Sequence, residues 1–163
     1  MPRRVLFCFV VAALLFLGLD ISLKRYVFLH ISPFQGVFVF RNFFGIDFSL
    51  DYVKNTGAAW GFLSSLQSYL LWGRCAIILS LLGFIFFSSL PFGRKAFLSW
   101  IVAGAFGNVL DFFIYGHVVD MFHFCFWGYS FAVFNIADSM IFCGVAALFI
   151  QQYLENRLQK KIV

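Results

Sequence analysis

The sequence predicts an all-α membrane bundle of four transmembrane helices, with a small external β-rich cradle between the first two helices. Three observations lead to this class: an apolar composition, four apolar segments of membrane-spanning length, and an aromatic segment with strand character. Hydrophobic residues occupy 63% of the 163 positions and charged residues only 12%, against about 45–50% and about 25% in soluble domains. A soluble domain of this size leaves much of its surface in water, so we expect lipid to solvate most of the chain, as a single domain over residues 1–163.

Four apolar segments approach the length of about 20 helical residues that a hydrocarbon core about 30 Å thick requires. They cover residues 5–27, 69–90, 97–114 and 134–154. Basic residues precede the first segment, as in a secretory signal peptide, but no small-residue cleavage site follows it cleanly. We therefore expect this segment to stay in place as a transmembrane helix.

Basic residues orient the predicted bundle, because cytoplasmic segments of membrane proteins are enriched in Lys and Arg. They cluster before the first span, between the second and third, and after the fourth, at Arg3, Arg4, Arg94, Lys95, Arg157, Lys160 and Lys161. We predict that both termini are cytoplasmic and that the loop of residues 28–68 is external. The net charge of +5 thus belongs to helix ends and not to one basic face, which argues against nucleic acid as a partner.

The external loop contains two short segments that are typical of β-strands. Residues 36–40 and 48–52 are rich in aromatic and β-branched side chains, and Asn42, Gly45 and Asn55 lie at their borders. Such runs, bounded by turn-forming residues, predict short strands. We expect these Phe-rich strands to lie on the membrane surface.

The acidic residues indicate where a functional site lies. In the predicted topology, four of the seven acids reach the external boundary of the bilayer: Asp20, Asp111, Asp120 and Asp138. Ionisable groups at membrane depth are costly and usually mark functional sites. The structural alternatives are an ordinary ion pair between Asp20 and Lys24, four residues later, and a favourable helix-dipole position for Asp138.

Two neighbouring carboxylates cannot both ionise easily, so they share a proton. Such a pair supplies a base to activate water and an acid to protonate the leaving amine in peptide hydrolysis. The predicted topology does not select two of the four acids.

Other kinds of site find little support in the sequence. The four cysteines show neither CxxC spacing nor a metal-ligand pattern with the three histidines, so we expect no metal or cofactor. No serine or cysteine has a base at suggestive spacing, and we expect His117 and His123 at the surface.

Two further functions stay open on the residues alone. A transporter or proton-conducting protein would use the aspartates as a relay through the bilayer, whereas here the acids stop at its outer boundary. A non-catalytic scaffold would make the aspartates dispensable.

Four short motifs, in family order, resemble those of the bacterial lipoprotein signal peptidases (signal peptidase II). They are Asp20 with Lys24, NTGAAW at 55–60, GNVLD at 107–111 followed by GHVVDM at 116–121, and FNIADS at 134–139. Each motif alone is weakly specific, but the four in register cover the chain from the first span to the fourth. The resemblance implies four helices with an external β-rich cradle.

The resemblance also implies an activity and a place in the cell. The family are membrane aspartic endopeptidases that cleave signal peptides from prolipoproteins, hydrolysing the bond before a diacylglyceryl-modified Cys. The catalytic pair that activates the water would be Asp120 and Asp138. The resemblance further implies a multi-pass protein of the bacterial cytoplasmic (inner) membrane, an active site at the outer face, membrane lipid as a partner, and inhibition by the cyclic peptide globomycin.

Two asparagines are candidates to support the proposed pair. The tetrahedral intermediate needs donors near its oxyanion, and Asn55 and Asn135 are placed to supply them. The alternatives are a tight turn for the segment from Asn55 to Gly57 and an N-cap of the fourth span for Asn135.

Asp111 is the main rival for a place in the pair. It shares a helix face with Asn108, three residues earlier, and we expect it to orient the substrate or the pair. We interpret Asp20 and Lys24 as structural support close to the site.

The chain departs from the family pattern beside Asp111. Where the family usually has Arg, this chain has Phe112, so the charge partner is missing or comes from elsewhere. We expect an arginine at residue 112 to be tolerated or beneficial. Gly104 and Gly107 are expected to allow close helix packing.

Overall fold

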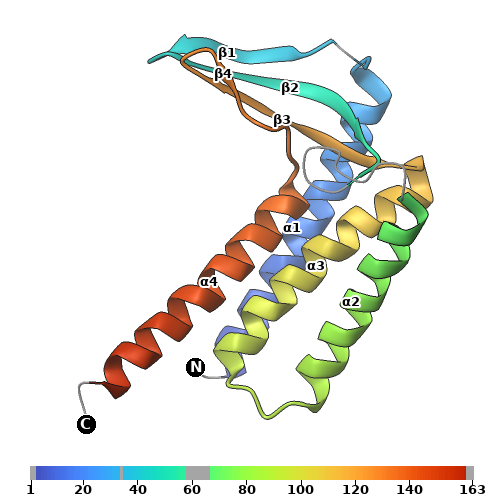
Figure 1. Ribbon diagram of the computed structural model, residues 1–163. Helices are drawn as coiled ribbons and strands as arrows, with labels where there is room; N and C mark the ends of the chain where they lie inside the picture. Colours follow the sequence, from blue (N-terminus) through green and yellow to red (C-terminus); the bar gives the residue numbers. More distant parts are fainter. Residues whose placement is uncertain (1–2, 34, 58–66, 161–163) are drawn as a thin grey trace.

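The computed structural model describes residues 3–33, 35–57 and 67–160. In these residues, four helices lie side by side and a small sheet covers the end of the bundle opposite both termini (Figure 1). The helices are α1 (Arg3–His30), α2 (Gln67–Phe87), α3 (Phe92–Tyr115) and α4 (Ile136–Gln159). Each predicted span is a helix, and all four are long and apolar enough to cross a membrane.

The α3 helix starts earlier than hydropathy predicted, at Phe92 and not at residue 97. Pro91 occupies the N-cap position, which suits proline because the first helical positions need no backbone donor. Arg94 and Lys95 therefore lie in the first turns of the helix and not in a loop. Long basic side chains can lie along a helix at the membrane boundary, because they cover apolar surface while keeping their charge in water. A prediction from hydropathy excluded these charged residues and therefore started the helix too late.

The sheet is larger than predicted. It is antiparallel, in the order β1-β2-β3-β4, and its strands are β1 (Val37–Phe43), β2 (Ile46–Asn55), β3 (Val118–Phe126) and β4 (Tyr129–Ser130). The two predicted strands are confirmed as β1 and β2. The prediction that the cradle lies between the first two helices alone is wrong, because β3 and β4 come from the segment between α3 and α4. Asp120, which follows the predicted span of residues 97–114, is part of β3.

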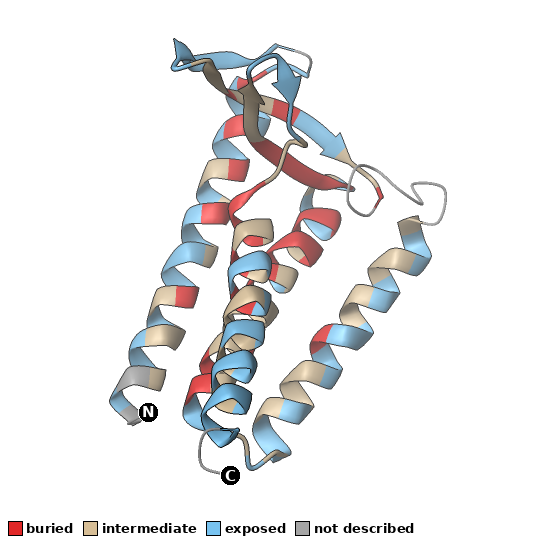
Figure 2. Cartoon of the chain, turned by 60° about the vertical axis from the view of Figure 1, so that its left-hand side comes forward, coloured by how far each residue is buried: buried red, intermediate tan, exposed pale blue. Residues whose placement is uncertain are grey.

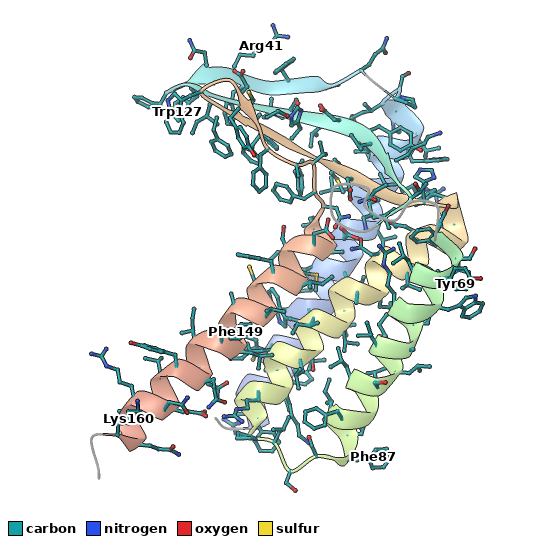
Figure 3. The ribbon with its side chains drawn as sticks, viewed as in Figure 1. Arg41, Tyr69, Phe87, Trp127, Phe149 and Lys160 are labelled. Atoms are coloured by element: carbon teal, nitrogen blue, oxygen red, sulfur yellow. The ribbon has the colours of Figure 1, made fainter. Side chains whose placement is uncertain are left out.

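Two tight turns build the sheet. Phe44 and Gly45 join β1 to β2 with φ values of 53° and 82°, and Trp127 and Gly128 join β3 to β4 with φ values of 48° and 82°. Two consecutive residues with positive φ fit the two-residue turns that match the twist of a hairpin. The two turns lie together, since the Trp127 amide donates to the Gly45 carbonyl over 2.8 Å, and Figure 3 shows Trp127 at the far tip of the sheet.

One face of the sheet is aromatic. The rings of Phe48 and Phe124 are stacked with centroids 4.5 Å apart, and Phe124 also stacks on Phe134 just before α4. Where β2 and β3 meet α1, Tyr52 and Met121 pack in a buried apolar cluster with Val27. The sheet is therefore fixed to α1 by its core and to α4 by its rings.

Close helix packing brings the site residues together. A Cβ atom on Gly104 would lie 2.5 Å from the Ala137 carbonyl oxygen of α4, and one on Gly107 would lie 3.1 Å from a Leu17 methyl group of α1. The expectation of close packing at Gly104 and Gly107 is confirmed. Figure 2 shows buried residues gathered where these helices meet the sheet, while much of the helix surface towards the termini is exposed.

Candidate active site

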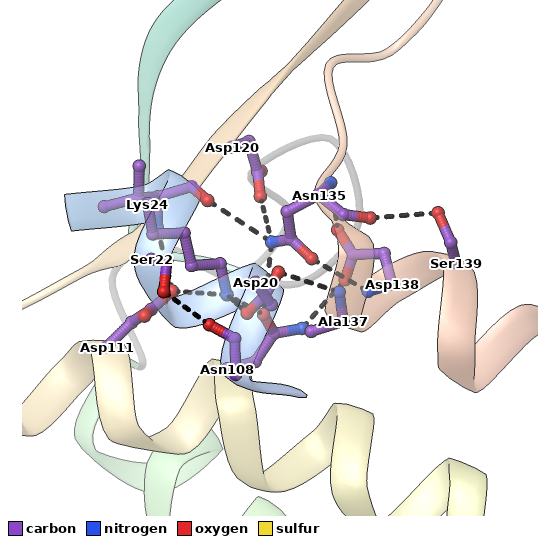
Figure 4. A network of polar contacts seen from close by, with 12 residues as sticks. Asp20, Ser22, Lys24, Asn108, Asp111, Asp120, Asn135, Ala137, Asp138 and Ser139 are labelled. Atoms are coloured by element: carbon purple, nitrogen blue, oxygen red, sulfur yellow. Dashed lines mark hydrogen bonds and ion pairs between the residues drawn. The ribbon is translucent and has the colours of Figure 1, made fainter. Parts of the chain in front are cut away.

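The structure joins all four boundary acids in one polar network between the helix ends and the sheet (Figure 4). The four come from α1, α3, β3 and α4, in the order Asp20, Asp111, Asp120 and Asp138. The first three are exposed by only 0%, 2% and 3%, whereas Asp138 is partly exposed. Segments far apart in the sequence thus converge as the predicted topology requires.

Lys24 lies at the centre of one half of the network. Its Nζ is 2.7 Å from a carboxylate oxygen of Asp20, 2.7 Å from one of Asp111, and 3.0 Å from Oδ1 of Asn108. An ammonium group has three donors, so each finds an acceptor. The Asp20–Lys24 pair is fully buried, unlike an ordinary surface ion pair, and Lys24 connects α1 to α3.

Asp20 and Asp111 each hold the backbone beside one member of the proposed pair. Oδ1 of Asp20 accepts from the Ala137 amide over 3.0 Å, and Oδ2 of Asp111 accepts from the Val119 amide over 3.2 Å. Ala137 directly precedes Asp138, and Val119 directly precedes Asp120. The Lys24-centred half therefore fixes the backbone of the other half.

Asn135 connects Asp120 and Asp138. Its Nδ2 donates to Oδ1 of Asp120 over 2.7 Å, and its Oδ1 accepts from the Asp138 amide over 2.8 Å. Asp138 in turn accepts from the Asn135 amide over 3.2 Å, which completes a capping box at the start of α4. The N-cap alternative is thus confirmed for Asn135. Its amide is occupied by Asp120 and its neighbours, which argues against a second role as oxyanion donor.

Two further asparagines hold the outer oxygens of the two carboxylates. Asn108 donates to Oδ1 of Asp138 over 2.8 Å, and Asn55 donates to Oδ2 of Asp120 over 3.0 Å. The Gly57 amide donates to Oδ1 of Asn55 over 3.0 Å, which is the turn expected for this motif. The rest of that motif, residues 58–60, lies outside the described residues.

Burial and charge raise the pKa of Asp120 to about 7. Loss of hydration is the main cause, and the neighbouring carboxylate of Asp138 adds to it, while the hydrogen bonds from Asn55 and Asn135 act in the opposite direction. Two close carboxylates share a proton in this way when one environment disfavours ionisation. Asp120 is therefore more easily protonated near neutral pH than an ordinary aspartate.

A cavity of about 590 Å³ opens beside this half of the network. Of the four acids, Asp120 and Asp138 line it, together with Asn55, Asn108 and Arg74. The remaining walls are largely apolar and come from the segment before α4 and from α4 itself: Phe131, Ala132, Val133, Phe134 and Phe142. Asp20, Lys24 and Asp111 lie behind these residues, outside the lining.

Arg74 of α2 is a cavity residue that the sequence analysis missed. An arginine inside an apolar span is itself a signal, because charges there usually face a polar interior. Its Nη2 donates to the Gly57 carbonyl over 2.7 Å, so it holds the turn that carries Asn55. Within the described residues, no group of three or more His, Cys, Asp or Glu is arranged to hold a metal ion.

Of the two histidines expected at the surface, His117 is buried and His123 is partly exposed. His117 is buried, with its Nε2 2.9 Å from the Tyr52 hydroxyl. His123 lies 2.7 Å from Asp51 through Nδ1 and 2.8 Å from the Ser130 hydroxyl through Nε2, so the fold brings a serine beside a base although their spacing in the sequence did not suggest it. Asp51, His123 and Ser130 lie on three different strands and outside the cavity lining. We interpret their contacts as a structural cross-link within the sheet.

Known proteins resemble this chain over most of its length. Residues 12–154 match the model of a family described as signal peptidase (SPase) II. The lipoprotein signal peptidase of Latilactobacillus sakei is 32% identical over 153 residues, covering 92% of this chain and 96% of that protein. The one from Chlamydia pneumoniae is 36% identical over 116 residues, covering 70% and 69%.

A solved structure has the same fold. It is described as a bacterial membrane enzyme structure obtained by the in meso method at 2.3 Å resolution, and it superposes with a TM-score of 0.80. The two chains are 26% identical, over 91% of this chain and 89% of the other.

Proposed function

This chain belongs to the signal peptidase II family of lipoprotein signal peptidases, and we propose that it hydrolyses the bond before a diacylglyceryl-modified Cys with water activated by Asp120 and Asp138. The observation that carries the proposal is that these two acids alone of the four line the cavity. Asn135 contacts both of them. Water held at the cavity wall would thus meet two carboxyl groups in a fixed relation.

The two aspartates take different parts in the reaction. Asp120, with a pKa of about 7, holds the proton, and Asp138, which accepts hydrogen bonds from Asn108 and from the Asn135 amide, acts as the base. Asp138 takes a proton from water as the water oxygen bonds to the scissile carbonyl carbon. Asp120 gives its proton to the amine nitrogen as the C–N bond breaks, and the proton on Asp138 then restores the pair.

Asn55 is the candidate donor to the oxyanion. Its Nδ2 has two hydrogens, one of which goes to Asp120, and the residue lines the cavity. The second hydrogen has no acceptor among the described residues and would stabilise negative charge on the substrate carbonyl oxygen. Asn108 lines the cavity and holds Asp138, whereas Asp111 supports the pair from outside the cavity lining.

The apolar walls of the cavity suit a lipid-modified substrate. Rings and aliphatic side chains next to the aspartate pair, among them Phe131, Val133 and Phe142, would receive the diacylglyceryl group, since burying apolar chains is favourable. We expect globomycin to compete for the same cavity, as the family resemblance implies.

The proposed setting is the bacterial cytoplasmic (inner) membrane, with the sheet and the aspartate pair at its outer face. Both termini and the α2–α3 connection lie at the end of the bundle away from the sheet (Figure 1). The clusters of basic residues before α1, between α2 and α3 and after α4 belong to that end, which the positive-inside rule assigns to the cytoplasm. The aromatic face of the sheet would then rest on the membrane surface, where aromatic side chains are enriched.

A cleavage assay with matched substrates tests the function. The purified protein in lipid is given a prolipoprotein before and after diacylglyceryl modification of its Cys. We expect cleavage of the modified form only, blocked by globomycin. Equal cleavage of both forms would contradict the lipid requirement, and no cleavage of either would contradict the function.

A further inference from the structure

We propose that Arg74 binds the substrate, donating from its guanidinium to the carbonyl oxygen of the scissile peptide bond of the prolipoprotein. The inference rests on the proposed function and adds a substrate-contacting residue to it. Arg74 lies in the second turn of α2 and lines the same cavity as Asp120 and Asp138. The carboxylates of Asp120 and Asp138 both favour its positive charge.

Two contacts show how the guanidinium is held. Its Nη2 donates to the Gly57 carbonyl over 2.7 Å, and its central carbon lies 5.3 Å from the centroid of the Phe112 ring. Arginine stacks well on aromatic rings because its guanidinium is planar and weakly hydrated. The side chain is thus fixed in place before any substrate enters.

The guanidinium has a donor to spare. Nη1 of Arg74 is buried and has no hydrogen-bond partner among the described residues. A buried charged donor without a partner is costly, because it has lost its hydration and gained no hydrogen bond in return. A substrate oxygen in the cavity would supply the missing acceptor.

The charges around the cavity decide which kind of oxygen fits. With one proton shared by Asp120 and Asp138, the four acids carry three negative charges, and Lys24 is already bound to Asp20 and Asp111. The site therefore stays negative overall even with Arg74, which disfavours the phosphate of a lipid headgroup. A neutral peptide carbonyl, whose oxygen gains negative charge during attack, is the better match.

The position of Arg74 also accounts for Phe112, which stands where the family usually has an arginine. The chain has no arginine after Asp111, and Phe112 instead packs under an arginine from another helix. The ring and the cation form one unit, so a second arginine at residue 112 would remove the ring and crowd Arg74. The expectation that arginine is tolerated there is accordingly revised.

The test compares Arg74→Gln and Arg74→Lys with Arg94→Gln, a partly buried arginine at the other end of the bundle that pairs with Glu155. We expect kcat/KM for the lipidated substrate to fall about 100-fold in Arg74→Gln, the loss typical of one donor to a developing oxyanion. Arg74→Lys keeps the charge but not the two-donor fork, and we expect a loss of about tenfold. Arg94→Gln should keep wild-type kinetics.

Two readouts separate substrate contact from a purely structural role. In Arg74→Gln the acidic limb of the pH profile should move to higher pH, because the cation that favours ionised carboxylates is gone. Arg74→Leu combined with Phe112→Arg, which returns a guanidinium from α3, should recover at least tenfold over Arg74→Leu alone.

The contrary outcomes are distinct. Wild-type kcat/KM and pH profile in both Arg74→Gln and Arg74→Lys, with Asp120→Asn inactive, would overturn the inference and leave the function standing. If Arg74→Gln does not accumulate as folded protein, Arg74→Lys decides on the same criteria. No cleavage by the unchanged protein would overturn the proposed function, and the inference with it.

Discussion

The side-chain amide of Asn135 donates to the carboxylate of Asp120 over 2.7 Å. The same asparagine caps the helix that carries Asp138, so one residue sets the relation between a strand and a helix. Behind it, Lys24 holds the two acids that bind the amides of Val119 and Ala137. The site thus has two layers. The ion pairs of Lys24 with Asp20 and Asp111 form the inner layer, and they position the aspartates Asp120 and Asp138, which face the cavity.

Replacing Asn135 by Ala should impair both stability and cleavage. It removes an N-cap, which contributes about 1 kcal/mol, and it leaves a buried oxygen of Asp120 without its donor. We expect a lower Tm and a loss of cleavage of about 100-fold or more. Asn156→Ala, at the exposed end of the same helix, is the matched control and should leave both unchanged. Normal cleavage by Asn135→Ala would show that the contacts of Asn135 with Asp120 and Asp138 are dispensable.

Replacing Lys24 by Met should destabilise the fold. Met has a similar length but leaves Asp20 and Asp111 buried without their cation, and breaking a buried ion pair costs about 3–5 kcal/mol. Thermal unfolding in detergent should show a large drop in Tm, against no change for the exposed Lys54→Met. A Tm equal to that of the unchanged protein would mean that the two acids are neutral in the fold.

Asp120→Asn should stabilise the protein at neutral and basic pH. The pKa of Asp120 is raised from 3.8 to about 7 in the folded state, so its contribution to stability is fully present below about pH 4 and is lost as pH rises through about 7. Asn resembles the protonated form, so the gain in Tm over the unchanged protein should be absent near pH 4, grow towards pH 7 and level off above it. A gain that is the same at every pH would argue against the raised pKa.

Gly104→Ala should separate α3 from α4. The added Cβ would lie 2.5 Å from the Ala137 carbonyl oxygen, a backbone atom beside Asp138 that cannot move alone. We expect a lower Tm together with reduced cleavage. Gly83→Ala, where nothing lies within 4 Å, is the control and should be neutral or slightly stabilising. Full activity in Gly104→Ala would mean that the helices can shift without disturbing the site.

The helices were predictable because lipid selects for segment length and composition, and those properties are local. The strands β3 and β4 were missed because β3 pairs with β2, which precedes it by a whole helical hairpin. The alternation in residues 118–126 and the Trp127-Gly128 turn were the local signals available.

The site was predictable in part. Span direction placed four acids at one boundary, but which of them faces a cavity depends on side-chain direction in the folded protein. Lys24 was expected to meet Asp20 at helical spacing, whereas its contact with Asp111 depends on how α1 packs against α3. Arg74 was missed because Gly57 and Phe112, the residues it contacts, lie on separate segments.

The most direct test of the account is cleavage of a diacylglyceryl-modified prolipoprotein by Asp120→Asn and Asp138→Asn in lipid. We expect both to be inactive while folded and inserted, Asp111→Asn to keep part of the activity, and Ser130→Ala, which breaks the His123 contact, to keep all of it. Full activity in either of the first two variants, or inactivity of Ser130→Ala, would contradict the assignment of Asp120 and Asp138 as the catalytic pair.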